Sequence, residues 1–183
     1  MKELSLNILD IVENSVKAGA SLTEITVSET DELLTLTVKD NGCGMSDETE
    51  KSVIDPFYTT RTTRKVGLGI PLLKLAAEQT GGGIEITSKT KEEDETEHGT
   101  VITARFYKNH LDFTPLGDVV STMQTLVQGH PDVDFLFVHT APGRNVRLDT
   151  REMREILGED VPLNSFEIIS WIGDFLKEQY ESV

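Results

Sequence analysis

The run KVGLGIPLLKLAAEQTGGGIEITS, from Lys65 to Ser88, predicts a glycine-flanked helix followed directly by a strand. Apolar residues recur at helical spacing from 68 to 78, and three consecutive glycines then end the helix. The residues that follow, 84–90, form a strand run. Gly67-Leu68-Gly69 stands at the helix start, where unpaired N–H groups and the helix dipole favour a polyphosphate, although a single Gly-x-Gly is a weak signal.

Further strands and a first helix surround this stretch. The predicted strands are separated by polar turns and span 24–28, 33–39, 84–90 and 100–107. The first two are expected to form an antiparallel pair. An amphipathic helix from 4 to 18 precedes them and ends at Gly19. Residues 46–65 read as a long loop with a short helix near 48–53, and long loops in compact domains are usually functional.

A second unit is expected from residue 109 onward. Its predicted elements are a helix from 114 or 115 to 127, strands at 133–139 and 144–148, a helix from 149 or 150 to 157, and a last helix from 164 or 165 to about 180. We therefore divide the chain into residues 1–108 and a small α/β extension at 109–183. The order of elements predicts an α+β fold, a sandwich of one mixed sheet under helices.

The charge of the chain excludes some classes of partner. The 32 acidic residues against 17 basic ones give a formal charge of -15, so the chain as a whole should be repelled by nucleic acid and by anionic lipid. We find no signal segment and no long apolar run, and we expect a cytoplasmic protein without nucleic-acid or membrane partners. A single cysteine, Cys43, excludes an intrachain disulfide and a Cys-rich zinc site.

Two other motifs place polar residues where a ligand could bind. Asp10, Glu13, Asn14 and Lys17 fall along one stripe of the first helix, a pattern that by itself is more typical of a solvated helix face. Residues 40–45, DNGCGM, follow a strand directly, and their two glycines let the backbone approach a flat ring or a phosphate. Each motif alone is weak evidence, and only the order in which the motifs follow one another is specific.

The ordered set of motifs resembles the GHKL ATPases, the superfamily of gyrase, Hsp90-like chaperones, histidine kinases and mismatch-repair ATPases. The similar segments, in the order of the family's boxes, are ENSVKAGA (13–20), DNGCGM (40–45), DPFYTTR (55–61), the run 65–88 and the final Gly99-Thr100. The resemblance extends from about Leu4 to Tyr107. It implies a two-layer sandwich of the Bergerat type, with a mixed, mostly antiparallel sheet under helices, which binds ATP with magnesium.

The resemblance assigns the adenine end of the nucleotide to four positions. Asp40 would accept a hydrogen bond from the adenine amino group and would repel the carbonyl of guanine. Thr100 would support the same ring edge, directly or through water. Gly42 and Gly44 would let the chain close over the base.

The resemblance also assigns the phosphate end. Asn14 would hold Mg²⁺ through its side-chain oxygen, and Lys17 matches a basic position of histidine kinases that can meet a phosphate. The backbone N–H groups of Gly67, Leu68 and Gly69 would bind the β- and γ-phosphates. Cations of the lid would neutralise charge on the transferring group; Lys65 is the first choice, before Arg64 and Arg61.

Position 10 departs from the hydrolytic members of the family. Those ATPases carry Glu four residues before the Asn, as the general base for the attacking water, whereas this chain has Asp10. Asp is one methylene shorter, and a base must come within about 3 Å of the proton that it takes. Asp10 is therefore a candidate base for weak hydrolysis.

Three uses of ATP stay open. The first is phosphotransfer in the manner of histidine kinases, acting in trans, because none of the four histidines is followed by the Glu and Pro-bearing helix of an acceptor. The second is a slow ATPase switch, whose lid closure alters docking to a partner. The third is a non-catalytic ATP sensor in which 109–183, with Trp171 and Phe175, form a partner or homo-oligomer surface. We favour phosphotransfer or nucleotide-dependent regulation in trans on a partner protein.

Overall fold

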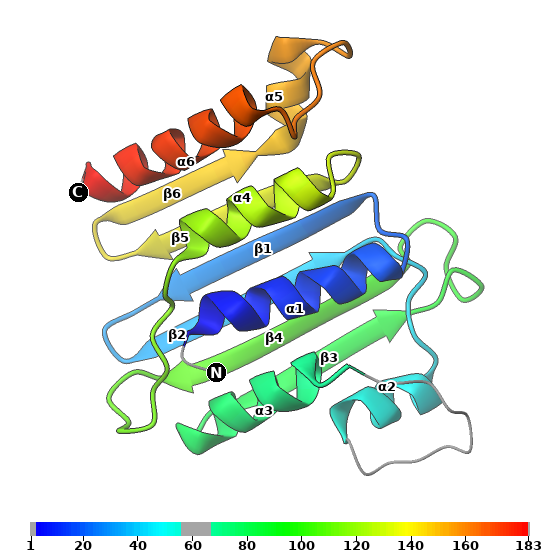
Figure 1. Ribbon diagram of the computed structural model, residues 1–183. Helices are drawn as coiled ribbons and strands as arrows, with labels where there is room; N and C mark the ends of the chain where they lie inside the picture. Colours follow the sequence, from blue (N-terminus) through cyan, green and yellow to red (C-terminus); the bar gives the residue numbers. More distant parts are fainter. Residues whose placement is uncertain (1–2, 56–66, 183) are drawn as a thin grey trace.

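The computed structural model describes residues 3–55 and 67–182, and within these ranges six strands form one mixed sheet in the order β3-β4-β2-β1-β5-β6 (Figure 1). The strands are β1 (Leu22–Glu29), β2 (Leu33–Asp40), β3 (Gly83–Lys89), β4 (Gly99–Tyr107), β5 (Asp134–Ala141) and β6 (Arg144–Asp149). β1 and β5 run parallel, and the other neighbours are antiparallel. The predicted antiparallel pair of the first two strands is confirmed.

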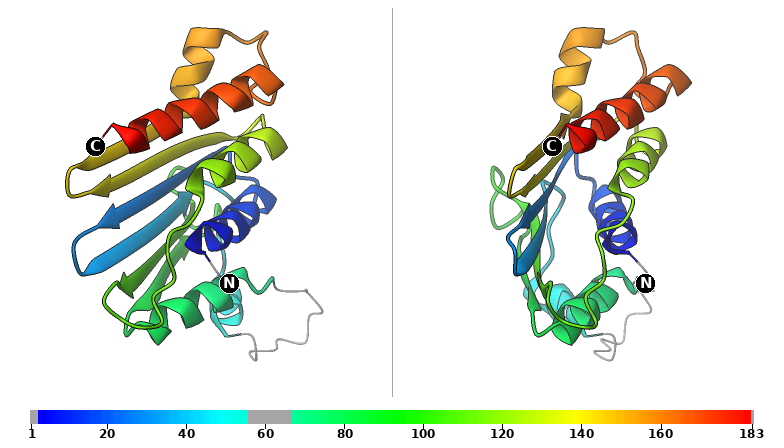
Figure 2. Two further views of the ribbon diagram at one scale, coloured as in Figure 1. Left: turned by 60° about the vertical axis from the view of Figure 1, so that its left-hand side comes forward. Right: turned by 90° about the vertical axis from the view of Figure 1, so that its left-hand side faces the viewer.

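Helices cover one face of this sheet (Figure 2). The helices are α1 (Leu4–Lys17), α2 (Asp47–Ile54), α3 (Gly69–Gln79), α4 (Val119–Gly129), α5 (Thr150–Leu157) and α6 (Phe166–Glu181). Of these, α1, α3, α4 and α6 lie along the covered face, so the predicted α+β sandwich of one mixed sheet under helices is confirmed. No helix in the described ranges combines the length and the apolar character that crossing a bilayer requires.

The core forms where the apolar stripe of α1 meets the inward positions of the strands. Leu4, Ile8 and Ile11 are fully buried, and burial alternates residue by residue along β1 and β2. A strand points successive side chains to opposite faces, so each strand presents one apolar face to the helices. Fully burying a Leu or Ile side chain contributes about 1.5–3 kcal/mol, so this contact fixes α1 against the sheet.

The segment after residue 108 continues the same sheet. β5 lies beside β1 in parallel register, from Leu22 opposite Asp134 to Ser28 opposite Thr140. The domain boundary between residues 108 and 109 stays a prediction. The strands before it and after it belong to one hydrogen-bonded sheet.

The predicted start of the helix at 114 or 115 is wrong, because α4 begins at Val119. The carbonyl groups of Pro115 and Leu116 instead accept hydrogen bonds from the backbone N–H groups of Leu4 and Ser5, at 2.9 and 2.8 Å. Residues 115 and 116 therefore cap the start of α1, and α4 begins only after them.

Candidate functional site

The carboxylate of Asp40 is held at the end of β2 by two donors. Ser15 Oγ on α1 donates to Asp40 Oδ2 at 2.7 Å, and the backbone N–H of Gly42 donates to Oδ1 at 2.9 Å. An ionised carboxylate has about four lone-pair positions. Among the described residues only these two groups donate to Asp40, so about two lone-pair positions of the carboxylate remain for a donor of a ligand.

Thr100 stands directly opposite Asp40 in the ladder between β2 and β4 and is 8% exposed. Its Oγ1 lies 2.8 Å from Ser88 Oγ, which in turn donates to the carbonyl of Gly99 at 3.1 Å. A serine hydroxyl has one proton, so Thr100 must be the donor to Ser88. The Thr100 oxygen is then left as an acceptor, beside the acceptor oxygens of Asp40.

The glycines of DNGCGM allow a close turn after β2. A β-carbon on Gly42 would come 2.9 Å from the Ala18 Cβ, and one on Gly44 would overlap the carbonyl of Lys89. Gly44 also has a φ of +72°, which side-chain-bearing residues rarely adopt. His98 Nδ1 approaches the Gly42 carbonyl at 2.5 Å. The turn is thus packed against α1 on one side and β3 on the other.

The polar stripe of α1 lies beside the start of α3. A β-carbon on Gly69 would come 3.1 Å from the Asp10 Cβ, so the lack of a side chain at Gly69 lets the two helices meet. Asn14 lies one turn further along α1 and is partly buried, and Lys17 is the exposed last residue of the helix. The predicted phosphate-end residues Asp10, Asn14 and Gly69 are therefore neighbours on two adjacent helices.

The start of α3 leaves few backbone donors. No side chain caps this helix, and its first turn contains Pro71, which has no N–H group. The N–H groups of Gly69 and Ile70 therefore lack a partner within the helix. Gly67 and Leu68 are exposed, and Leu68 is the N-cap residue.

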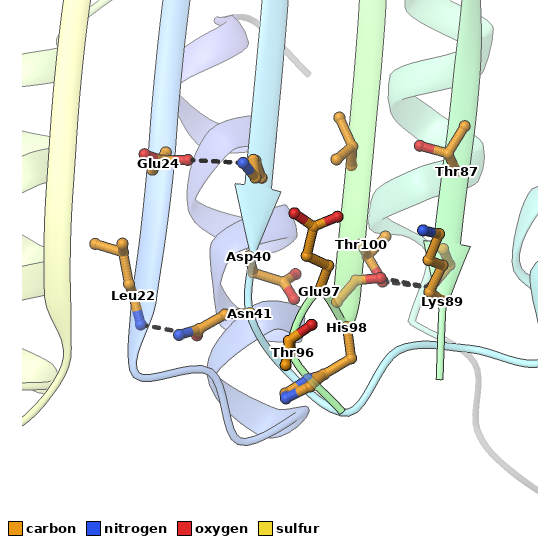
Figure 3. A pocket seen from close by; sticks show the side chains of 14 residues that line it. Leu22, Glu24, Asp40, Asn41, Thr87, Lys89, Thr96, Glu97, His98 and Thr100 are labelled. Atoms are coloured by element: carbon orange, nitrogen blue, oxygen red, sulfur yellow. Dashed lines mark hydrogen bonds and ion pairs between the residues drawn. The ribbon is translucent and has the colours of Figure 1, made fainter. Parts of the chain in front are cut away.

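A cavity of about 540 Å³ opens at the same strand ends, but on the face of the sheet away from the helices (Figure 3). Glu24 and Lys39, which form an ion pair at 3.7 Å, line this cavity from β1 and β2. Of the predicted site residues, only Asp40 and Thr100 border it. Because Asn14 and Asp10 stand on the helix side, this cavity is distinct from the predicted nucleotide pocket.

The sequence model of one family matches residues 2–110, and it is described as histidine kinase-, DNA gyrase B-, and HSP90-like ATPase. The chain belongs to this family. The predicted GHKL resemblance is therefore confirmed, and the matched range holds every predicted site residue of the first helix, of the strand ends and of the start of α3.

Several GHKL sensor kinases resemble part of the chain. The sensor histidine kinase YvrG of Bacillus subtilis (strain 168) is 34% identical over 105 residues, which are 54% of this chain and 17% of that kinase. The signal transduction histidine-protein kinase AtoS of Escherichia coli (strain K12) is 30% identical over 88 residues, 48% of this chain and 14% of that kinase. The chain thus matches only a small part of the length of these kinases.

Two solved structures share the fold of this chain. The Aquifex aeolicus MutL ATPase domain complexed with ADP superimposes with a TM-score of 0.56 at 17% identity, over 85% of this chain and 69% of that one. The N-terminal domain of a DNA repair protein gives a TM-score of 0.57 at 16% identity, over 87% of this chain and 58% of that one. These likenesses show the fold, and they confirm the predicted sandwich of the Bergerat type.

The residues present fit a magnesium ion that shares its ligands with phosphates. The described residues contain no group of three or more His, Cys, Asp or Glu side chains that could hold a metal by itself. Asn14 offers an amide oxygen on α1, one turn after Asp10, which packs against Gly69 at the start of α3. Mg²⁺ is usually bound by one or two protein oxygens together with substrate phosphates and water, which agrees with a single Asn ligand.

Three predicted residues cannot be placed, and two residues of the site were not predicted. Lys65, with Arg61 and Arg64, lies outside the described residues. Sequence reasoning missed Ser15 and Ser88, which hold Asp40 and Thr100 in place. The signal for Ser15 was its position beside Asn14 on the inward face of the first helix, whereas the role of Ser88 depends on strand register.

Proposed function

We propose that this GHKL chain binds ATP with magnesium on the helix side of the β2 and β4 ends. The observation that carries the proposal is the Asp40 carboxylate, fixed by Ser15 and Gly42 and placed opposite Thr100. These oxygens can accept hydrogen bonds from the amino group of adenine. A guanine carbonyl would face a carboxylate with like partial charge, so adenine is favoured over guanine.

The phosphates would lie between α1 and the start of α3. The N–H groups of Gly69 and Ile70, which have no partner within the helix, and the positive end of the helix dipole suit phosphate oxygens. Asn14 would hold the magnesium ion, and Lys17 at the end of α1 adds a positive charge. When bound, the ion would neutralise negative charge on the phosphates.

We propose that the bound ATP serves phosphotransfer or nucleotide-dependent regulation in trans on a partner protein. The matched relatives YvrG and AtoS are named as histidine kinases, which favours phosphotransfer. The four histidines of the chain already have contacts: His98 with the Gly42 carbonyl, His110 with Asp112, His130 with Glu13, and His139 with Glu29 and Tyr180. An acceptor on another protein agrees with these contacts.

Slow hydrolysis is the alternative that the geometry of Asp10 favours. Asp10 is exposed on α1, and its Cβ packs where Gly69 lacks a side chain, so its short carboxylate stands close to the proposed phosphate position. Its reach is one methylene less than that of Glu, so any water activation should be weak.

A surface on α6 favours a protein partner over a chain that acts alone. Trp171 is 48% exposed and stacks on Phe175, with ring centroids 4.7 Å apart and an angle of 11° between the planes. Phe166, at the start of the same helix, is 83% exposed. Exposed aromatic side chains on one helix suit docking of a partner protein or of a second copy.

ATP labelled at its γ-phosphate, incubated with the full chain, magnesium and candidate partner proteins, tests these uses. Covalent label on a partner supports phosphotransfer. Free phosphate from the chain alone, reduced by Asp10→Ala with binding unchanged, supports a slow ATPase. Nucleotide that is bound and released unconverted supports a sensor, and failure to bind ATP contradicts all three.

A further inference from the structure

A second cavity, of about 380 Å³, lies at the end of the sheet opposite to the predicted nucleotide site. It is bordered by the end of β1, the start of α4, the β5–β6 hairpin and the last turns of α6, which lie together in Figure 1. Leu116, Val119 and Val120 give it an apolar wall, and Arg144, Lys177 and Tyr180 give it polar groups. Small-molecule sites usually combine a mostly apolar wall with a few polar groups in this way.

Arg144 is the first of two cations in this cavity that have no carboxylate partner among the described residues. Its guanidinium lies over the ring of Tyr180, 5.4 Å from the centroid, and its Nε is buried without a hydrogen-bond partner. Across residues 3–55 and 67–182, the structure gives its side chain no carboxylate within 4.0 Å. A buried donor that makes no hydrogen bond costs about 1–3 kcal/mol, and more for a charged group. An oxyanion in the cavity would give the guanidinium the ion-pair partner that it lacks among the described residues.

Lys177 adds a second positive charge to the same cavity. It too has no carboxylate within 4.0 Å in the described part of the chain. It is close enough to Asp118 to contribute to that residue's lowered pKa, which hydrogen bonds from Ser121 chiefly cause. The cavity therefore holds two cations whose direct partners are missing.

The carboxylates of the cavity are mostly engaged elsewhere. Glu29 pairs with Lys108 at 2.7 Å and with His139 Nε2 at 2.8 Å. Asp118 accepts from the backbone N–H and the hydroxyl of Ser121, at 3.0 and 2.7 Å, as the N-cap of α4. This capping also means that the start of α4 is not the anion-binding group. Glu181, the remaining carboxylate at the rim, is exposed.

His139 and Tyr180 form an uncharged floor. Burial, despite the bonds to Glu29, lowers the pKa of His139, so its imidazole is neutral near neutral pH. Its Nε2–H then donates to Glu29, and its Nδ1 accepts from the Tyr180 hydroxyl at 2.8 Å. The floor thus adds no positive charge, and the anion-binding capacity of the cavity depends on Arg144 and Lys177.

We propose that this cavity binds a small molecule with a carboxylate or phosphate group, through Arg144 and Lys177, with the rest of the ligand against Leu116, Val119 and Val120. Arg matches both oxyanions, because its planar fork can donate two parallel N–H bonds. The site is separate from the nucleotide pocket: β1 begins at Leu22 beside Asn41 and ends at Glu29, so the two lie at opposite ends of one strand.

NMR of the Arg Nε–H signals in the full chain tests the proposal, with inorganic phosphate and succinate added separately as probes. We expect the Arg144 signal to move with one or both probes. A response to phosphate alone would indicate a phosphate ligand, and a response to succinate alone would indicate a carboxylate ligand. R144Q should weaken the probe's affinity by roughly tenfold or more, as expected for loss of charge-assisted hydrogen bonds. K177Q should weaken it less.

The matched control is R147Q, on the same strand but on its other side, where Arg147 pairs with Asp149 and Glu152. It should leave the probe's affinity unchanged. Asn14→Ala, which addresses the nucleotide site, should also leave the Arg144 response intact, so the two proposals can fail separately. An Arg144 signal in the wild-type chain that moves with neither probe would overturn the proposal, as would equal affinities of R144Q and R147Q.

Discussion

Ser15 Oγ donates a 2.7 Å hydrogen bond to Asp40 Oδ2 and thereby joins the middle of α1 to the end of β2. Ser15 is 3% exposed and lies beside Asn14, the proposed magnesium ligand. One turn of α1 therefore presents the proposed metal ligand with one residue and orients the proposed adenine acceptor with the next. This coupling would place both ends of the proposed nucleotide relative to a single helix.

Ser15→Ala should weaken ATP binding by roughly tenfold, because a hydrogen bond to a charged group contributes about 1.5–3 kcal/mol and Asp40 would lose one of its two fixed donors. Isothermal titration with ATP and magnesium measures the change. Ser5→Ala is the control, since Ser5 is equally buried on α1 but bonds to Glu3. Equal affinities of the two variants would show that Ser15 does not orient Asp40 for binding.

Asn14→Ala should remove the magnesium dependence of ATP binding. In the wild-type chain, chelation of magnesium should weaken binding strongly, because Asn14 would hold the ion that neutralises the phosphate charge. In the variant, titrations with and without magnesium should give the same weak affinity. Glu13→Gln, the neighbouring change on the side that faces His130, should keep the dependence. A full magnesium effect in Asn14→Ala would remove Asn14 from the metal site.

Gly44→Ala should destabilise the fold much more than Gly143→Ala. Both glycines have nearly the same positive φ, +72° and +73°, so both variants suffer the backbone strain of about 1–2 kcal/mol. Only at Gly44 would the new β-carbon also overlap the Lys89 carbonyl, whereas Gly143 has open space. Urea unfolding gives both free energies. Similar losses in the two variants would mean that the turn after β2 is not tightly packed.

Acid should destabilise the protein in two stages. Burial lowers the pKa of His139 below 6.5, so the unfolded state binds more protons once the pH drops below that value, and folding stability falls. For Glu29, hydrogen bonds from Lys108 and His139 outweigh burial and lower the pKa below 4.5, so its contribution is lost at still lower pH.

Thermal unfolding of the wild-type chain and His139→Gln between about pH 7 and about pH 5 checks the first stage. The variant should lose less stability on acidification than the wild type, whatever its starting stability. His110→Gln, at an exposed histidine, should follow the wild type. A slope in His139→Gln that is as steep as in the wild type would contradict the assignment.

Local patterns predicted most of the elements of this chain. The apolar spacing of 4–18 corresponds to α1, and the strand runs correspond to β1 to β6 within a few residues. The start of α4 was placed too early, because Pro115 favours a helix start locally while its carbonyl is used by the N terminus of α1. Such a bond joins residues more than a hundred positions apart, and no local pattern reports it.

The residues of the candidate site likewise fall into those that the sequence predicted and those that it could not. The motif order predicted Asp40, Asn14 and Gly69 as parts of one site, and this stays a prediction: Asp40 bonds to Ser15 of α1 and Gly69 packs against Asp10 of the same helix. Ser15 and Ser88 could not be predicted, because their roles depend on a hydrogen bond across 25 residues and on the register that puts Ser88 opposite Thr100. Sequence periodicity gives a residue's face but not its partner.

The most direct test compares titrations of ATP and GTP, each with magnesium, on the wild-type chain and on Asp40→Asn. If the carboxylate of Asp40 reads the adenine amino group, the folded wild type binds ATP and strongly prefers it to GTP, and the variant loses most of both the affinity and the preference. A folded wild type that gives no heat with ATP, or that binds ATP and GTP equally well, would contradict the account.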